Sequence, residues 1–300
     1  MTFGRGIRGT LREHEPMGRH TSWRAGGRAR RYFEPAGVED LVAFVRELPA
    51  TEAVLWLGLG SNLLVRDGGV QATVIQTRKA LPDLERLQES RVRVGAGVAC
   101  AQVARACARW GLQGAEFLSG IPGTIGGALA MNAGAWGAET WERVIALETL
   151  DQAGTRHWRS PAEYHIGYRT VVAPAQEAFL GATLELDCGG DPRALGARVR
   201  DLLARRATAQ PLGRPSCGSV FRNPPGDFAA RLIDQAGLKG QRRGGACVST
   251  KHANFILNQG DASASDIETL IGYVRRRVRD LYGVELQTEV CIVGEEPGHG

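Results

Sequence analysis

The sequence lacks any apolar run long enough to cross a membrane. A membrane-spanning helix needs about 18 or more consecutive apolar residues, and no stretch of this chain reaches that length. Residues 1–17 are basic and polar, without the apolar segment of a secretion signal. We therefore expect no membrane insertion.

The chain also lacks the residue spacings of metal sites and disulfide frameworks. Its six cysteines are scattered, with no Cys-x-x-Cys pair, and its six histidines show no ligand spacing. Scattered cysteines of this kind are typical of free thiols in a reducing compartment. We expect a cytoplasmic protein with no bound metal.

A basic segment interleaved with aromatic residues, as in many nucleic-acid-binding proteins, is absent too. The net charge of +5 comes from 37 Lys and Arg against 32 Asp and Glu, spread along the chain. Arginine outnumbers lysine, which suits recognition of phosphates and carboxylates. We expect an anionic small-molecule partner and no nucleic acid.

Glycine is abundant: the 40 glycines are roughly twice the ~7% of average usage. Eight of them lie in two loops. The first, Gly58-Leu59-Gly60-Ser61-Asn62, follows an apolar run, and the second extends over residues 119–137. Glycine allows positive φ and leaves no Cβ between backbone and ligand, so successive N–H groups can converge on phosphate oxygens. The two loops predict a dinucleotide site.

Neither loop matches the common nucleotide-binding motifs. The first lacks the third glycine of the nicotinamide-type motif, and no Gly-Lys-[Ser/Thr] of a triphosphate-binding loop occurs. A lone Gly-x-Gly also fits a tight turn between strands. The second loop is harder to explain by ordinary turns.

Hydrophobic periodicity predicts a mixture of helices and strands. The predicted helices cover 38–48, 100–110, 192–207 and 227–236, and the predicted strands cover 53–58, 72–76, 91–94, 144–150, 179–186, 246–249, 254–257 and 284–293. A further long helix begins at a capping box from Ser265 to Glu268 and ends at Gly283. The mixture predicts an α+β fold.

Four polar residues stand outside the glycine loops as candidates for chemistry. Ser219 follows a glycine, Arg169 follows Tyr168, Glu289 lies in a strand-like run and Lys239 follows a helix end. Each also has an ordinary explanation: a turn serine, a surface arginine, a solvated strand face and a cation at a helix C-terminus. Local spacing alone assigns none of them to catalysis.

Several motifs occur in a fixed order along the chain. They are Gly-x-Gly-Ser-Asn, Ser-Gly-Ile-Pro-Gly-Thr-Ile-Gly-Gly, Met-Asn-Ala-Gly-Ala, Gly-Tyr-Arg, Gly-Ser-x-Phe-Arg-Asn-Pro, Ala-Gly-Leu-Lys-Gly, Lys-His-Ala-Asn-Phe and a final Glu-Val. From about residue 21 to residue 293 the chain resembles the UDP-N-acetylenolpyruvoylglucosamine reductases (UDP-N-acetylmuramate dehydrogenases) of early peptidoglycan synthesis.

The resemblance implies a two-part FAD-binding domain of the vanillyl-alcohol-oxidase (PCMH) type and a C-terminal α/β substrate-binding domain. On this basis we expect an extension at 1–15, FAD-binding subdomains at 16–85 and 86–205, and a substrate-binding domain at 206–300. It also implies that FAD binds non-covalently. The implied cofactor contacts are Gly58, Leu59, Gly60, Ser61, Asn62, Ser119, Gly120, Ile121, Pro122, Gly123, Thr124, Gly126, Gly127, Asn132 and Gly134.

The implied reaction has two halves. NADPH reduces the flavin, and flavin N5 then delivers hydride to C3 of the enolpyruvyl ether of UDP-N-acetylglucosamine. Arg169 and Glu289 would stabilise the charge that develops on the substrate, and Ser219 would give the proton to C2. Tyr168, Asn223, Lys239 and His252 would bind substrate, and we expect a monomer.

The chain departs from the longer members of the family. The segment between Arg169 and Ser219 is short and carries no insert with a substrate-facing tyrosine, as in the type II branch. Arg222 stands where many members have lysine, Trp136 where tyrosine is common, and His252 where the longer branch has glutamine. Two alternatives stay open: another FAD-dependent oxidoreductase of this fold acting on an alcohol or hydroxy acid, and a binding protein without activity.

Overall fold

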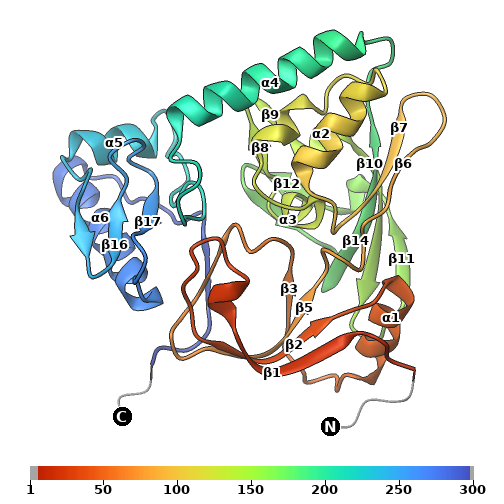
Figure 1. Cartoon of the computed structure of the whole chain (residues 1–300), viewed down its shortest axis with the longest axis horizontal. Helices are drawn as coiled ribbons and strands as arrows, with labels where there is room; N and C mark the ends of the chain where they lie inside the picture. Colours follow the sequence, from red (N-terminus) through yellow and green to blue (C-terminus); the bar gives the residue numbers. More distant parts are fainter. Residues whose placement is uncertain (1–5, 298–300) are drawn as a thin grey trace. The chain divides into compact units, whose positions relative to one another are not determined.

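The computed structural model describes residues 6–297, which form two compact units. Unit 1 contains the described residues up to Arg12, together with Tyr32–Gly58 and Ala72–Arg206. Unit 2 contains Glu13–Arg31, Leu59–Gln71 and the described residues from Ala207 onward. Each unit therefore combines segments that are far apart in the sequence, as the colours of Figure 1 show.

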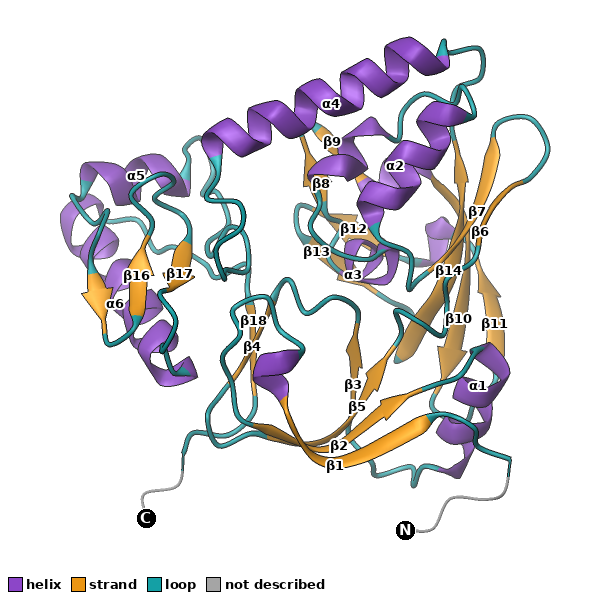
Figure 2. Ribbon diagram, viewed as in Figure 1, coloured by secondary structure: helices purple, strands orange, loops and turns teal. Residues whose placement is uncertain are grey.

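The largest sheet of unit 1 has five antiparallel strands (Figure 2). Its order is β11 (Arg156–Arg159), β10 (Val144–Asp151), β14 (Glu177–Glu185), β7 (Arg91–Gly95) and β6 (Leu84–Arg86). Helix α2 (Cys100–Arg109) packs its buried stripe against the same core as Val92 and Val94, and α4 (Pro192–Ala209) packs Leu195 and Val199 against Ala108 of α2. The predicted helices 100–110 and 192–207 are confirmed.

Cys100 and Cys107 belong to this core, since both side chains are fully buried. Burial raises the pKa of each thiol to about 12. A thiol with so high a pKa is a poor nucleophile. The two cysteines therefore serve packing.

A second sheet has the strand order β1 (Thr10–Pro16), β2 (Arg28–Glu34), β5 (Val70–Gln76) and β3 (Val54–Leu57). Strands β3 and β5 are parallel, with Leu55 opposite Val74. Within unit 1, α1 (Val38–Glu47) covers this region: Phe44 stacks on Phe33 with ring centroids 3.7 Å apart. The predicted helix 38–48 is confirmed.

Short elements connect these layers of unit 1. They are 3-10 turns at Glu116–Gly120 (η2), Thr140–Arg143 (η3) and Pro161–Glu163 (η4), helix α3 (Ile125–Ala130), and the strands β8 (Gly134–Ala135), β9 (Ala138–Glu139), β12 (His165–Gly167) and β13 (Thr170–Val172). Strands β8 and β9 form one hairpin, and β12 and β13 form another.

Unit 2 is built on a three-stranded antiparallel sheet of β15 (Arg242–Arg243), β16 (Ala246–Val248) and β17 (Ile256–Asn258). Helices α5 (Ala229–Gln235) and α6 (Ala264–Tyr282) share its core. Strand β4 (Leu63–Val65) runs parallel to β18 (Cys291–Val293). Trp23, next to η1 (Met17–Arg19), is fully buried and its indole N–H donates to the carbonyl of Ile256 at 2.7 Å.

The predicted capping box of α6 is wrong by two residues. The Ser263 hydroxyl accepts a hydrogen bond from the Asp266 N–H at 3.0 Å, and the Asp266 carboxylate accepts one from the Ser263 N–H. Glu268, the expected partner of Ser265, instead pairs with Arg66 at 2.8 Å. The end of the helix at Gly283, with φ of 67°, is as predicted.

Two expectations about the chain ends also differ from the structure. Residues 10–15, expected in a loose extension, belong to β1, an edge strand whose charged side chains discourage pairing with another chain; residues 1–5 lie outside the described range. The strand expected over 284–293 is regular only at β18. The α+β class is confirmed, and no helix within residues 6–297 combines the length and apolarity needed to span a bilayer.

Candidate functional site

The two glycine loops approach each other inside unit 1. A Cβ on Gly58 would lie 2.3 Å from Thr124 Oγ1, so the backbone of the first loop comes this close because residue 58 has no side chain. The N–H of Gly126 donates to the carbonyl of Ala96 at 2.8 Å, and a Cβ on Gly126 would lie 3.0 Å from the Ala96 methyl. A side chain at position 58 would therefore collide with Thr124, and one at position 126 would press on Ala96.

Thr124 carries the feature of this region that suits a phosphorylated ligand. Its side chain is 1% exposed, and Thr124 Oγ1 has no hydrogen-bond partner among residues 6–297. An unsatisfied buried hydroxyl is costly. Gly127 leaves open space here, because a Cβ on it would meet only Thr124 Oγ1, at 4.0 Å. A phosphate oxygen would satisfy this hydroxyl, so the residues fit a dinucleotide such as FAD.

The remainder of the first loop, residues 59–62, belongs to unit 2. Gly60 has a φ of 64°, and a Cβ on it would lie 2.0 Å from the carbonyl oxygen of His20. Asn62 donates its side-chain N–H to the backbone carbonyl of Glu289 at 3.0 Å. A residue predicted to bind cofactor thus supports the backbone of one predicted to be catalytic.

Ser219 and Glu289, two of the three predicted catalytic residues, are brought together in unit 2. The Glu289 N–H donates to the carbonyl of Val220 at 2.8 Å, and the Arg222 N–H donates to the carbonyl of Gln287 at 2.9 Å. Residues 220–222 and 287–289 are therefore paired backbone segments. Both predicted residues are half-buried.

Asn254 is a further residue of this arrangement that sequence reasoning did not single out. It is 4% exposed, its Oδ1 accepts from the Phe221 N–H at 2.9 Å, and its Nδ2 donates to the Phe221 carbonyl at 2.8 Å. Its own carbonyl accepts from the Val220 N–H. The Lys-His-Ala-Asn-Phe motif contains it, and that was the only signal in the sequence.

Arg169, the third predicted catalytic residue, lies at the tip of the β12–β13 hairpin in unit 1. Its φ is 52°, a conformation uncommon for a bulky residue. The guanidinium donates to the carbonyls of Asn132 at 3.2 Å and Gly134 at 2.9 Å, and it lies 5.0 Å from the ring centre of Tyr168. Arg169 is thus joined to two of the predicted cofactor residues.

The Asn132 side chain is committed to protein partners. It is 1% exposed, and Nδ2 donates to Glu139 Oε2 at 2.7 Å and to the Gly167 carbonyl at 3.2 Å. Oδ1 accepts from the Trp141 N–H at 3.2 Å. Both amide hydrogens are used, so the side chain serves the local structure.

The four predicted substrate contacts have different surroundings. Tyr168 is 48% exposed. Asn223 is exposed, and its Oδ1 accepts from the Ala229 N–H at the start of α5. Lys239 pairs with Asp234 at 2.6 Å. Asn223, Lys239 and His252 all belong to unit 2, whereas Tyr168 belongs to unit 1.

His252 has an unusual polar environment. Its Nδ1 is buried and has no hydrogen-bond partner within the described part of the chain, and its ring packs edge-on against Phe255 at 4.8 Å. Burial, and then the positive charge of Lys239, lower the pKa of His252 below its ordinary value. The neutral imidazole is therefore favoured.

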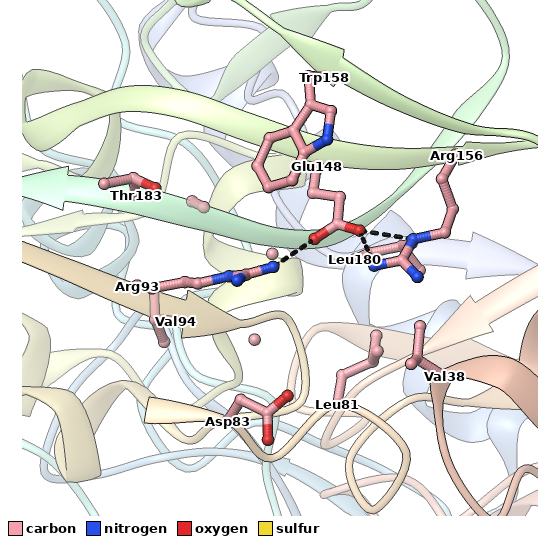
Figure 3. Close-up of a pocket in the computed structure, with 13 residues that line it drawn as sticks. Val38, Leu81, Asp83, Arg93, Val94, Glu148, Arg156, Trp158, Leu180 and Thr183 are labelled. Carbon is pink, nitrogen blue, oxygen red and sulfur yellow. Dashed lines mark hydrogen bonds and ion pairs between the residues drawn. The ribbon is translucent and has the colours of Figure 1, made fainter. Parts of the chain in front are cut away.

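A pocket on the five-stranded sheet contains none of the predicted residues. Figure 3 shows Glu148 held between Arg93 and Arg156, beside Trp158. Arg93 donates to Glu148 at 3.2 Å and lies 5.6 Å from the Trp158 ring centre. Gly95 lies opposite Gly181 across the strands. The acidic and basic groups neutralise each other, so the pocket shows no preference for an anion.

Two family models match the chain. Residues 210–293 match the C-terminal domain of UDP-N-acetylenolpyruvoylglucosamine reductase, and residues 29–160 match an FAD binding domain. The second match includes both glycine loops, and the first includes Ser219 and Glu289.

Similar proteins extend over nearly the whole chain. Proteins named UDP-N-acetylenolpyruvoylglucosamine reductase from Alkalilimnicola ehrlichii and Methylococcus capsulatus are 58% and 57% identical, covering 96% of this chain and 96% and 94% of theirs. The crystal structure of UDP-N-acetylenolpyruvylglucosamine reductase from Thermus caldophilus is similar with a TM-score of 0.79 at 33% identity, covering 95% of this chain and 99% of that chain.

The environment of His252 predicts a pH-dependent contribution to stability. Because its pKa is lowered in the folded state, this contribution is complete above the unfolded-state pKa of about 6.5 and decreases as the pH falls below it. In His252→Gln, the free energy of unfolding from urea titrations should change less between about pH 7.5 and about pH 5.5 than in the parent. His14 is an exposed histidine of the same unit, so His14→Gln is the matched control. Equal pH dependence in H252Q and the parent would contradict the prediction.

Proposed function

The chain belongs to the UDP-N-acetylenolpyruvoylglucosamine reductase family, and on this premise we propose that it reduces the enolpyruvyl ether of UDP-N-acetylglucosamine to UDP-N-acetylmuramate. It is an FAD-dependent oxidoreductase of peptidoglycan precursor synthesis, with NADPH as the reductant. The observation that carries the proposal is the pairing of the Ser219 and Glu289 segments within the matched C-terminal domain.

We propose that residues 58–62 and 119–127 hold FAD, with its pyrophosphate next to Thr124. The unpartnered hydroxyl of Thr124 and the open space at Gly127 support this placement. Bound FAD would supply hydride transfer, from NADPH to the substrate. Asn132 and Gly134, also expected at the cofactor, would contribute through the backbone conformation that they hold.

Ser219 is proposed to donate the proton that C2 of the substrate needs. As hydride adds at C3, negative charge develops at C2 and spreads into the neighbouring carboxylate. Groups positioned at that carboxylate stabilise the charge, and we assign this role to Arg169 and Glu289. The backbone of Glu289 is held on one side by Val220 and on the other by Asn62, which supports a fixed position.

The substrate contacts, domain boundaries and location are proposals of the same kind. Lys239 and exposed Asn223 would bind anionic parts of the substrate, and Tyr168 and His252 would complete the contacts. The domain boundaries proposed are 16–85, 86–205 and 206–300. A cytoplasmic location is supported by the six free cysteines. The monomeric state stays a prediction.

Absorbance spectra of the purified protein test the reaction directly. NADPH added without oxygen should bleach the flavin band, and UDP-N-acetylglucosamine enolpyruvate should then restore it. Bleaching that only oxygen reverses would reject the proposed substrate and favour an oxidase of the same fold. A protein without a flavin band would reject the cofactor.

Ser219→Ala tests the proton donor. Reduction of the flavin by NADPH should keep the parent rate, because that half-reaction needs no proton at C2. Reduction of the sugar nucleotide should slow by about 10²–10⁴-fold, the usual range for loss of an acid catalyst. Ser216→Ala, three residues earlier in the same loop, is the control and should behave as the parent. Equal slowing of both half-reactions in stopped-flow measurements would contradict the assigned role.

Gly127→Ala tests the placement of FAD. A Cβ here meets nothing closer than 4.0 Å, and alanine is the better helix former, so the FAD-free variant should unfold at the temperature of the FAD-free parent or above. Its flavin content, from the ratio of flavin to protein absorbance, should fall because the methyl group occupies the proposed phosphate space. Gly196→Ala, a glycine of α4, should keep full flavin content. If G127A kept its full flavin content, the FAD phosphates would have to bind elsewhere.

A further inference from the structure

Two hairpins of unit 1 carry non-glycine residues in left-handed backbone conformation. The β8–β9 hairpin turns through Trp136 and Gly137, with φ of 52° and 84°, and the β12–β13 hairpin turns through Tyr168 and Arg169, with φ of 52° at Arg169 (Figure 2). Such conformations are costly for bulky residues and persist only where surrounding contacts hold them. The contacts that hold these two tips therefore matter.

The hairpins hold each other through reciprocal hydrogen bonds. Arg169, from the second hairpin, donates to the carbonyls of Asn132 and Gly134. Asn132, beside the first hairpin and itself at φ of 44°, donates to the carbonyl of Gly167 in the second. A side chain on each side thus donates hydrogen bonds to backbone carbonyls on the other.

Glu139 lies where these bonds converge. It is the last residue of β9 and stands opposite Gly134 in the hairpin register. Its Oε2 accepts from Asn132 Nδ2 at 2.7 Å, and its Oε1 lies 3.7 Å from Nη1 of Arg169. The Arg169 side chain is 15% exposed and that of Glu139 31%, so solvent screens the pair only in part.

We propose that Glu139 is a positioning residue for Arg169, an inference that rests on the proposed role of Arg169. The Glu139 carboxylate attracts both the Arg169 guanidinium and the Asn132 amide. These two side chains in turn hold the strained backbone of the two hairpins. Without it the buried Asn132 amide loses its shortest acceptor, and the cation loses its anionic neighbour. A displacement of about 1 Å in a group that acts on the transition state can cost roughly a hundredfold in rate.

Glu139→Gln separates the charge from the shape. Glutamine can still accept the bond from Asn132, so folding and FAD content should stay at parent levels. The charge facing Arg169 is lost, and kcat for the sugar nucleotide should fall about ten- to a hundredfold. KM should change less, since the interaction lost acts in the transition state. Glu142→Gln, an exposed carboxylate three residues on, is the control and should match the parent.

A double-mutant cycle with Arg169→Lys shows whether Glu139 acts through Arg169. If it does, adding E139Q to R169K should lower kcat by less than about twofold, because coupled residues are not additive. The inference would be overturned if E139Q lowered kcat as much in R169K as in the parent, or if E139Q alone kept the parent kcat. If E139Q unfolds at a lower temperature, E139D takes its place: it keeps the charge but withdraws the carboxylate from Arg169 by one methylene, and its effect on kcat should likewise be smaller in the R169K background than in the parent. No turnover by the parent would instead overturn the proposed function, and with it the role of Arg169.

Discussion

Close approach of backbone to backbone at glycine is the constraint on which both units depend. In unit 2, a Cβ on Gly60 or Gly69 would lie within 2.3 Å of a carbonyl oxygen of another segment, and in unit 1 a Cβ on Gly97 would lie 2.4 Å from the carbonyl oxygen of Thr77. Any side chain would force these segments apart. The high glycine content therefore reflects chain packing first. Of the helical glycines in the second loop, Gly127 is the one that leaves its space open for a ligand.

Asparagine side chains support the segments that carry the proposed chemistry. Asn254 brackets the backbone of Phe221, next to the Ser219 segment, and Asn62 holds the carbonyl of Glu289. Asn132 joins the hairpin of Arg169 to that of Glu139. An amide both donates and accepts, so one side chain can satisfy two backbone groups at once. Each proposed catalytic residue is thereby supported by an amide from a remote part of the chain.

Prediction from the sequence succeeded where the signal was local. The helices at 38–47, 100–109 and 264–282 follow from the periodicity of their apolar residues. This pattern is local, because it involves only residues within a few turns of one another. The start of the last helix was misplaced because Ser263 and Ser265 each precede an acidic residue by three positions. Strand β1 was missed because its sequence is largely charged. It is a strand only through its hydrogen bonds to the neighbouring strand β2.

The sequence by itself determined the family, the helices and the candidate site residues, because ordered motifs and periodicity are properties of neighbouring residues. Only the tertiary structure decided which candidates are open to a ligand. Thr124 keeps an unpartnered hydroxyl, whereas the Asn132 amide is consumed by Glu139 and Gly167. It also revealed Glu139 and Asn254, which no spacing marks. The reason is physical: the partner that satisfies a buried polar group comes from another segment, and only folding brings the two together.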